Sequence, residues 1–141
     1  MKKWDERFLD MAKLVSTWSP YPRTKVGSVI VDQQNRVVSL GYNGLARTTN
    51  DNDRFEDREL SLDTIIHAEI NAILFAKKDL TDHTLYTYPF MPCSNCCQPI
   101  IQTGISRVVS FETDIERWKD SFEQSLKDFI EAKVEVVLYE I

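Results

Sequence analysis

Glycine, proline, cysteine and histidine are all scarce in this chain of 141 residues, which has four glycines, five prolines, three cysteines and two histidines. No low-complexity tract, polar linker or internal repeat divides the sequence, so we expect one domain over residues 1–141. No apolar run is long enough to span a bilayer, and the N-terminus has no apolar signal-peptide core. We therefore expect a cytoplasmic protein with no membrane partner.

An overall basic charge is also missing, because the formal net charge is −5. Residues 1–50 carry eight basic and four acidic side chains, whereas residues 51–141 carry nine basic and eighteen acidic ones. An acidic chain gains no long-range attraction to a polyanion, so we expect no binding of extended nucleic acid. A small phosphorylated ligand fits this charge if a few cations converge, and the first fifty residues are the place to look for them.

Apolar periodicity and turn residues predict an alternation of helices and strands. Helices are expected over 4–18, 63–78, 93–103 and 116–132, and strands over 25–31, 36–40, 83–88, 107–111 and 134–139. The first two strands read as a hairpin, and the later strands alternate with helices. This order favours the α/β class with a mixed sheet covered on both faces. Residues 46–63 are polar without an apolar period, so we expect a long loop there.

The three cysteines lie within five residues, in Cys93-Ser-Asn-Cys96-Cys97. A disulfide is disfavoured in a reducing compartment, so we interpret them as thiols or thiolates. Cys93 and Cys96 have the spacing of metal ligands, and positions i and i+3 share one face of a helix. The start of a helix lowers the pKa of a thiol, because the helix dipole and free N–H groups stabilise the thiolate. The pair therefore predicts a preformed clamp of two thiolates.

His67-Ala68-Glu69 is the second half of a candidate metal site. Residues two apart do not share a face of a regular helix, so His67 and Glu69 can converge only where the helix begins. Catalytic zinc usually has three protein ligands and a water, and His67 would complete such a set with the two cysteines. Glu69 would stay unbound as a proton shuttle. The combined pattern, H-x-E followed by P-C-x-x-C, is the signature of zinc-dependent base deaminases.

A closed structural zinc site, or thiols buried in a core, is the alternative interpretation. A structural site needs a fourth protein ligand, for which Cys97 and His83 are the only soft candidates. Cys97 follows Cys96 directly and so points about 100° away from it on a helix. We expect Cys97 to be a small buried apolar residue and His83 an ordinary histidine at the entry to a strand.

Six segments form a familiar set: Thr24-Lys-Val-Gly-Ser-Val-Ile-Val31, Gly41-Tyr-Asn-Gly44, His67-Ala-Glu-Ile-Asn-Ala-Ile73, Thr84-Leu-Tyr-Thr87, Pro92-Cys-Ser-Asn-Cys96 and Ile100-Ile-Gln-Thr-Gly-Ile105. With them the chain resembles the deoxycytidylate deaminase family of the cytidine-deaminase-like superfamily. The zinc pattern marks the superfamily, and the first two segments point to its nucleoside monophosphate branch. The resemblance implies a three-layer α/β/α sandwich around a five-stranded mixed sheet, Zn²⁺ as cofactor, a homo-oligomer (dimer or hexamer), and conversion of dCMP to dUMP with release of ammonia.

The resemblance also implies contacts with a small-molecule nucleotide. Asn43 is expected to contact the sugar, and Arg23 the phosphate, with Lys25 as a second candidate. Solvated charge at a strand edge is the alternative for both cations. Trp118 stands where many relatives have a tyrosine before x-Asp-Ser, and either lines the site or belongs to a helix core. From its place at a helix start, Ala68 would offer a backbone N–H to the base.

The sequence departs from the family after Gly44, where a proline and a glycine are usual and Leu45-Ala-Arg-Thr48 stands instead. That region helps to bind nucleotide triphosphate effectors in regulated members, so we do not extend allosteric control to this chain. Arg47 is a candidate contact for further phosphates, which leaves dCTP open as a substrate. The second zinc of some members needs more histidines and cysteines than this chain has.

Three other functions compete with a nucleotide deaminase. A tRNA adenosine deaminase should have a basic face, which the net charge disfavours. A free cytidine deaminase needs no phosphate pocket, so Arg23 and Lys25 discriminate against it. A non-catalytic zinc-binding module offers no reason for Glu69 beside His67. We therefore expect zinc-dependent hydrolytic deamination of a deoxycytidine nucleotide, while the sequence does not separate dCMP, dCTP and CMP.

Overall fold

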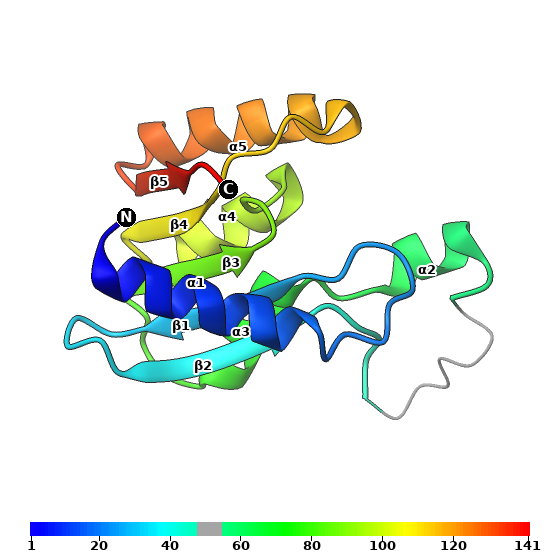
Figure 1. Cartoon of the computed structure of the whole chain (residues 1–141), viewed down its shortest axis with the longest axis horizontal. Helices are drawn as coiled ribbons and strands as arrows, with labels where there is room; N and C mark the ends of the chain where they lie inside the picture. Colours follow the sequence, from blue (N-terminus) through cyan, green and yellow to red (C-terminus); the bar gives the residue numbers. More distant parts are fainter. Residues whose placement is uncertain (48–54) are drawn as a thin grey trace.

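The computed structural model of the chain describes residues 1–47 and 55–141. In this part the elements are α1 (Lys3–Ser16), β1 (Gly27–Val31), β2 (Val37–Tyr42), α2 (Arg58–Thr64), α3 (Ala68–Ala76), β3 (Thr84–Tyr88), α4 (Ser94–Gln102), β4 (Arg107–Phe111), the 3₁₀ turn η1 (Glu116–Trp118), α5 (Lys119–Glu131) and β5 (Glu135–Tyr139). Figure 1 shows the strands as one sheet with helices in front of it and behind it. None of the helices in the described residues combines the length and apolar content that crossing a bilayer requires.

The sheet is mixed and has the strand order β2-β1-β3-β4-β5. β1 pairs antiparallel with β2 and with β3, whereas β3, β4 and β5 run parallel to one another. The parallel pairs need crossover connections, and α4 and α5 provide them. The expected five-stranded mixed sheet is confirmed.

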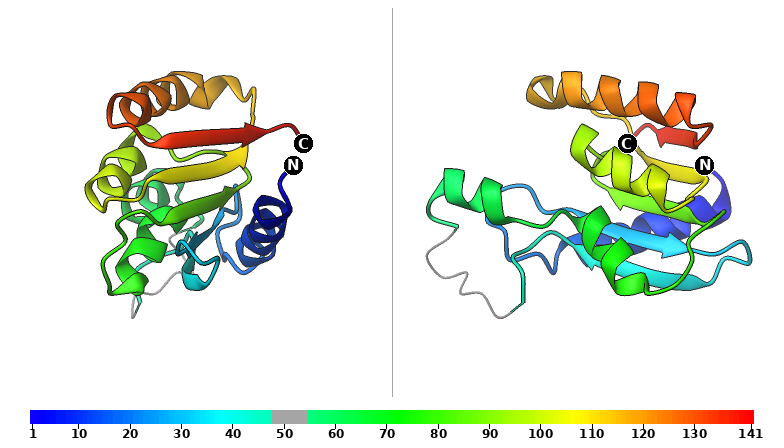
Figure 2. Two further views of the ribbon diagram at one scale, coloured as in Figure 1. Left: turned by 90° about the vertical axis from the view of Figure 1, so that its left-hand side faces the viewer. Right: turned by 180° about the vertical axis from the view of Figure 1, so that it is seen from behind.

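Helices cover the two faces of the sheet in separate layers. α1 lies on one face, and α3, α4 and α5 lie on the other, as the left view of Figure 2 shows. Every residue of β1 is buried, which explains its apolar Val-Ile-Val sequence, since a central strand covered on both faces has no solvent side. Val29 and Val31 pack under α1, and Ile30 packs in the core on the opposite face. The expected three-layer α/β/α sandwich is confirmed.

A glycine lets α3 lie directly on β2. A Cβ on Gly41 would stand 2.5 Å from the backbone nitrogen of Ala72 and 2.6 Å from the carbonyl oxygen of Ala68. Neither atom belongs to a flexible side chain that could move away. Gly41 therefore sets how closely the helix that begins next to His67 approaches the sheet.

The loop expected over residues 46–63 is wrong in its second part, because Arg58–Thr64 forms α2. The Asp57 side chain accepts a hydrogen bond from the backbone N–H of Leu60 at 3.1 Å and caps this helix. The polar composition hid the helix, since a short helix on the surface needs no apolar stripe of its own. Residues 48–54 of the expected loop lie outside the described residues.

The single helix expected over residues 63–78 is also wrong, because α2 ends at Thr64 and α3 begins at Ala68. Between them, Ile66 pairs with Gly44 through two backbone hydrogen bonds, of 3.1 and 2.7 Å. These long-range bonds hold residues 65–67 extended, so tertiary pairing overrides the helical periodicity there.

A buried carboxylate joins α1 to three strands of the sheet. Asp5, which is 2% exposed, accepts hydrogen bonds from both terminal nitrogens of Arg107 at 2.7 Å and from the hydroxyls of Tyr86 and Tyr139 at 2.7 and 2.6 Å. Burial by itself would raise the pKa of Asp5, but these hydrogen bonds and the charge of Arg107 lower it to about 2. The network lies on the α1 face, away from the helix starts described next.

Candidate metal centre and adjoining cavity

Two helices begin on the same face of the sheet, each immediately after one half of the metal motif. His67 is the N-cap residue of α3, with φ −69° and ψ 153°, and Cys93 is the N-cap residue of α4, with φ −70° and ψ 171°. The expectation that the histidine stands where a helix begins is therefore confirmed. Both residues face the free N–H groups and the positive dipole end of a first helical turn.

The structure brings three metal-binding atoms together from these helix starts. Nδ1 of His67 lies 3.1 Å from Sγ of Cys96 and 3.5 Å from Sγ of Cys93, and all three atoms lie within 4.8 Å of one another. Nitrogen and sulfur ligands of one tetrahedral zinc ion are separated by roughly 3.5 Å. The donor set and its spacing therefore fit one Zn²⁺, with a coordination position left for water. Among residues 1–47 and 55–141, no other histidine, cysteine or carboxylate joins this group.

The two other soft ligands of the sequence are engaged elsewhere. Cys97 is fully buried, and its sulfur lies 3.5 Å from the carbonyl oxygen of Ser125. Nδ1 of His83 lies 2.9 Å from the carbonyl oxygen of Thr81, next to the start of β3. Both residues therefore have the structural surroundings expected from the sequence, and neither adds a fourth ligand to the group within residues 1–47 and 55–141.

Hydrogen bonds in the cluster polarise its thiols. The hydrogen bond with Cys96, together with His67, lowers the pKa of Cys93 to about 4 against the effect of burial. The same bond and burial raise the pKa of Cys96, whose thiol is the donor. The bond to Cys93 raises the pKa of His67. Because zinc binds thiolates and neutral imidazole, loading the site releases protons held by these groups.

Glu69 points from the first turn of α3 into the same region and is 4% exposed. Burial raises the pKa of its carboxyl, although the nearby His67 acts in the opposite direction. Oε1 lies 3.2 Å from the hydroxyl of Thr87 and 3.4 Å from that of Ser28. A carboxyl whose pKa is shifted towards neutrality is suited to take up and return a proton.

A cavity of about 350 Å³ opens at this cluster. Its deep end is formed by His67, Ala68, Glu69 and Cys93, and its walls include Asn43, Phe90, Met91 and Trp118. Three exposed arginines, Arg23, Arg58 and Arg117, line its open end, and we call them the arginine rim. The size and this division into apolar walls and a few polar groups are typical of a small-molecule site.

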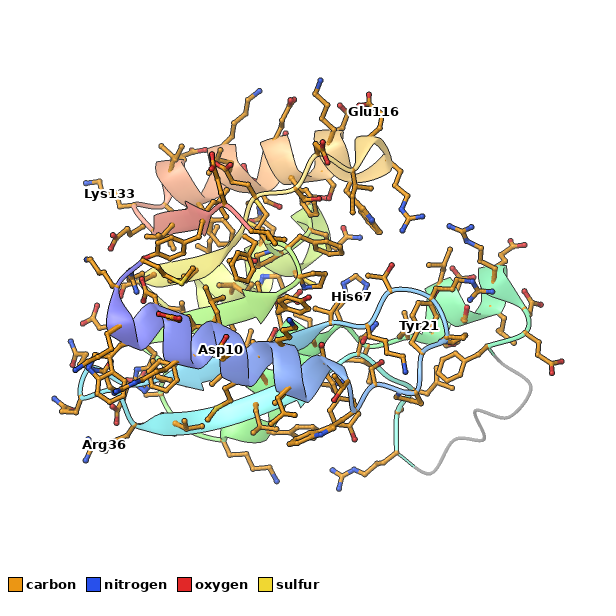
Figure 3. The ribbon with its side chains drawn as sticks, viewed as in Figure 1. Asp10, Tyr21, Arg36, His67, Glu116 and Lys133 are labelled. Carbon is orange, nitrogen blue, oxygen red and sulfur yellow. The ribbon has the colours of Figure 1, made fainter. Side chains whose placement is uncertain are left out.

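Hydrogen bonds connect the segments that carry the arginine rim. Arg23 donates to the hydroxyl of Ser61 on α2 at 3.2 Å, and Arg117 donates to the hydroxyl of Thr24 at 3.4 Å. Figure 3 shows the imidazole of His67 between the segment that carries Tyr21 and the turn marked by Glu116. The rim is therefore assembled from three parts of the chain that meet around the metal-binding cluster.

Some of the expected substrate contacts line this cavity, and one does not. Asn43 lines it, but its amide already accepts from the backbone N–H of Val26 and donates to the carbonyl of Thr24, both at 2.9 Å. Trp118 also lines it, packs against aromatic rings, and has an indole N–H with no hydrogen-bond partner in the described residues. Lys25 is exposed and is not among the residues that line the cavity.

Sequence reasoning missed two arginines of the rim and the two hydroxyls beside Glu69. Arg58 had no signal, because its place depends on the docking of α2. Arg117 precedes Trp118, a candidate site residue, and the sequence contains no other indication that Arg117 lies at the site. Ser28 and Thr87 did have a signal, since Ser28 adjoins an apolar Val-Ile-Val run and Thr87 stands between two tyrosines of its strand.

A family model and curated relatives agree with this site. Residues 2–112 match the family model described as the cytidine and deoxycytidylate deaminase zinc-binding region. The uncharacterized deaminase in luxG 3′ region of Aliivibrio fischeri is 43% identical over 139 residues, covering 96% of this chain and 93% of the relative. Human deoxycytidylate deaminase is 36% identical over 114 residues, which cover 76% of this chain and 64% of the human protein.

Among solved structures, the dCMP deaminase of cyanophage S-TIM5 in complex with dCMP and dUMP has a TM-score of 0.75 at 23% identity, over all of this chain and 99% of that chain. That similarity establishes the shared fold. The chain spans less than two thirds of the human relative, and nearly all of the bacterial one.

Proposed function

This chain belongs to the cytidine and deoxycytidylate deaminase family, and from that premise we propose that it is a zinc-dependent hydrolase converting dCMP to dUMP and ammonia. The observation that carries the proposal is the meeting of His67, Cys93 and Cys96 in one group, two of whose members line the same cavity as Glu69. These three residues would hold Zn²⁺, which supplies a Lewis acid that lowers the pKa of a bound water from about 15.7 towards neutrality.

Glu69 moves the protons of the proposed reaction. As the oxygen of water bonds to C4 of the cytosine ring, the Glu69 carboxylate takes a proton and passes it to N3. Glu69 then assists the transfer of a second proton to the 4-amino group, which leaves as ammonia when the C4–N bond breaks. Burial supports this role, because it raises the pKa of the carboxyl and so favours uptake of a proton from water.

The rest of the cavity would bind and orient the nucleotide. We assign the base to the backbone N–H of Ala68 at the start of α3, and the sugar and the ring to Asn43 and Trp118, because these residues line the cavity. We assign the 5′-phosphate to the arginine rim, because guanidinium groups bind phosphate through paired hydrogen bonds. Arg23 is the phosphate ligand expected from the sequence, and we add Arg58 and Arg117 as further phosphate ligands.

A second candidate substrate is dCTP. The rim carries three guanidinium groups, more positive charge than a monophosphate needs, and Arg47 is a further exposed cation. We propose a homo-oligomer on the family resemblance. The single domain and the cytoplasmic location expected from the sequence stay predictions.

The test is ammonia release from dCMP, dCTP, CMP and cytidine by the zinc-loaded protein and by Glu69→Gln. We expect dCMP to have the highest kcat/KM. Glu69→Gln should keep its zinc and its unfolding transition and lose activity by about 10²- to 10⁴-fold. Full activity of Glu69→Gln would refute the mechanism, and equal turnover of cytidine and dCMP would refute the phosphate assignment.

A further inference from the structure

Two buried hydroxyls lie between the sheet and Glu69. Ser28 on β1 and Thr87 on β3 are directly opposite each other in the antiparallel ladder, and both are fully buried. Their oxygens are 3.1 Å apart, and they lie 3.4 and 3.2 Å from Oε1 of Glu69. The three side chains therefore form one closed group beneath the cavity.

The strands do not need hydroxyls at these positions for packing. Ile30 and Leu85, two residues further along the same face of the same strands, are fully buried in the core. A buried hydroxyl costs free energy unless it is hydrogen-bonded, so a polar pair here requires a partner. Glu69 is the charged group that both hydroxyls reach, which indicates that the pair serves its carboxyl.

The two hydroxyls reach Glu69, each other and one backbone carbonyl. Each hydroxyl has one proton and rotates freely. The oxygen of Thr87 reaches a second acceptor, the carbonyl of Gly27, at 3.3 Å, and Ser28 reaches Thr87. Both protons can therefore reach Oε1 of Glu69 from the sheet side.

We propose that Ser28 and Thr87 are positioning residues for Glu69, holding Oε1 against the sheet so that the other carboxyl oxygen stays available to the cavity. The proposal rests on the proposed function, since it assumes that Glu69 shuttles protons. Two hydroxyls on two paired strands contact the same oxygen, which restricts the carboxyl more than one contact would. Neither residue lines the cavity, so we expect the effect to fall on turnover and not on binding.

The experiment compares Thr87→Val, Thr87→Ser and Ser28→Ala in the zinc-loaded protein. The matched control is Ser110→Ala: Ser110 on β4 is fully buried and donates to the carbonyl of Thr87 at 2.7 Å. We expect kcat for dCMP to fall roughly ten- to a hundred-fold in Thr87→Val combined with Ser28→Ala, with KM and zinc content unchanged. Thr87→Ser keeps the hydroxyl and should have most of the natural kcat. The control Ser110→Ala should have the natural kcat.

Unchanged kcat in the combined variant would overturn the proposal. An equal loss of kcat in Ser110→Ala or in Thr87→Ser would also overturn it. Crystal structures of Thr87→Val and the control add a readout that needs no activity. The carboxyl of Glu69 should move in the first and stay in the second, and an unmoved carboxyl in both also overturns the proposal. Because this readout does not depend on dCMP being a substrate, it separates failure of the positioning role from failure of the proposed function.

Discussion

The deep end and the open end of the cavity are built in opposite ways. At the deep end, His67, Glu69 and Cys93 are buried or half-buried and stand at the starts of two helices packed on the sheet. At the open end, the arginine rim is exposed and comes from three segments connected by single side-chain hydrogen bonds. The proposed chemistry therefore rests on the core of the fold, whereas the proposed phosphate recognition rests on its surface.

This difference explains why the two ends carry different information. A helix start presents its cap residue and first turn in a geometry that the backbone dictates, so ligands placed there are aligned wherever the helix packs. An exposed arginine has no such constraint, and its position depends on which segments dock beside it. We therefore expect substitutions at the deep end to abolish the reaction and substitutions at the rim to alter its selectivity.

The largest effect should come from removing a ligand at the deep end. Cys93→Ala should reduce bound zinc to a small fraction and reduce activity on the order of 10³-fold or more, because water is then no longer activated. Elemental analysis and ammonia release measure the two effects. Cys97→Ala is the matched control, since Cys97 is a buried neighbouring thiol that contacts Ser125. Loss of zinc in the control but not in Cys93→Ala would contradict the assignment.

At the rim, Arg23→Ala, Arg58→Ala and Arg117→Ala should each raise KM for dCMP about ten- to a hundred-fold and leave kcat/KM for cytidine unchanged. A hydrogen bond to a charged group contributes about 1.5–3 kcal/mol. Binding of dCMP would lose this contribution, whereas cytidine has no phosphate and would be unaffected. Steady-state kinetics with both substrates measures the contrast. A parallel loss with cytidine would mean that the rim shapes the whole cavity and does not select phosphate.

A third region sharpens the comparison, because it supports the fold without touching either end. The pKa of Asp5 is about 2 in the folded protein, against 3.8 for the free side chain. A lowered pKa stabilises the fold above pH 4, and this contribution of about 2 kcal/mol is lost as pH falls from about 4 to 2. Urea unfolding should show this loss in the natural protein, relative to Asp5→Asn.

Asp5→Asn itself should be less stable at pH 7, and its difference from the natural protein should shrink as pH falls towards 2 and below, because Asp5 then becomes protonated. Zinc content of the folded variant should be unchanged, since the network lies on the α1 face. A difference in stability that is constant over this pH range would show that Asp5 does not titrate as stated.

The smallest effect should come from Lys25→Ala. Lys25 is exposed and does not line the cavity, so its charge acts on a bound phosphate only through screened solvent. We expect kcat/KM for dCMP to change by about two-fold or less, far below the effect of Arg23→Ala. An effect as large as that of Arg23→Ala would place Lys25 in the site and enlarge the rim.

Sequence reasoning reached the strands and the metal donors for a shared reason. β4 was predicted with its observed bounds, Arg107–Phe111, because an isolated run of β-branched residues needs no distant partner to be recognised. The cysteine pair and the His-x-Glu motif are likewise local patterns. The same reasoning failed at residues 65–67, where pairing with Gly44 breaks an apparently continuous helix.

The sequence by itself determined the donor residues, the order of the elements and the α/β class, because each depends on spacing within one segment. Only the tertiary structure decided which face each donor presents, where α2 docks, and how Arg58 and Arg117 join Arg23 around the cavity. It also decided that Ser28 and Thr87 meet beneath Glu69. The physical reason is that such contacts join residues far apart in the chain, and no local periodicity encodes them.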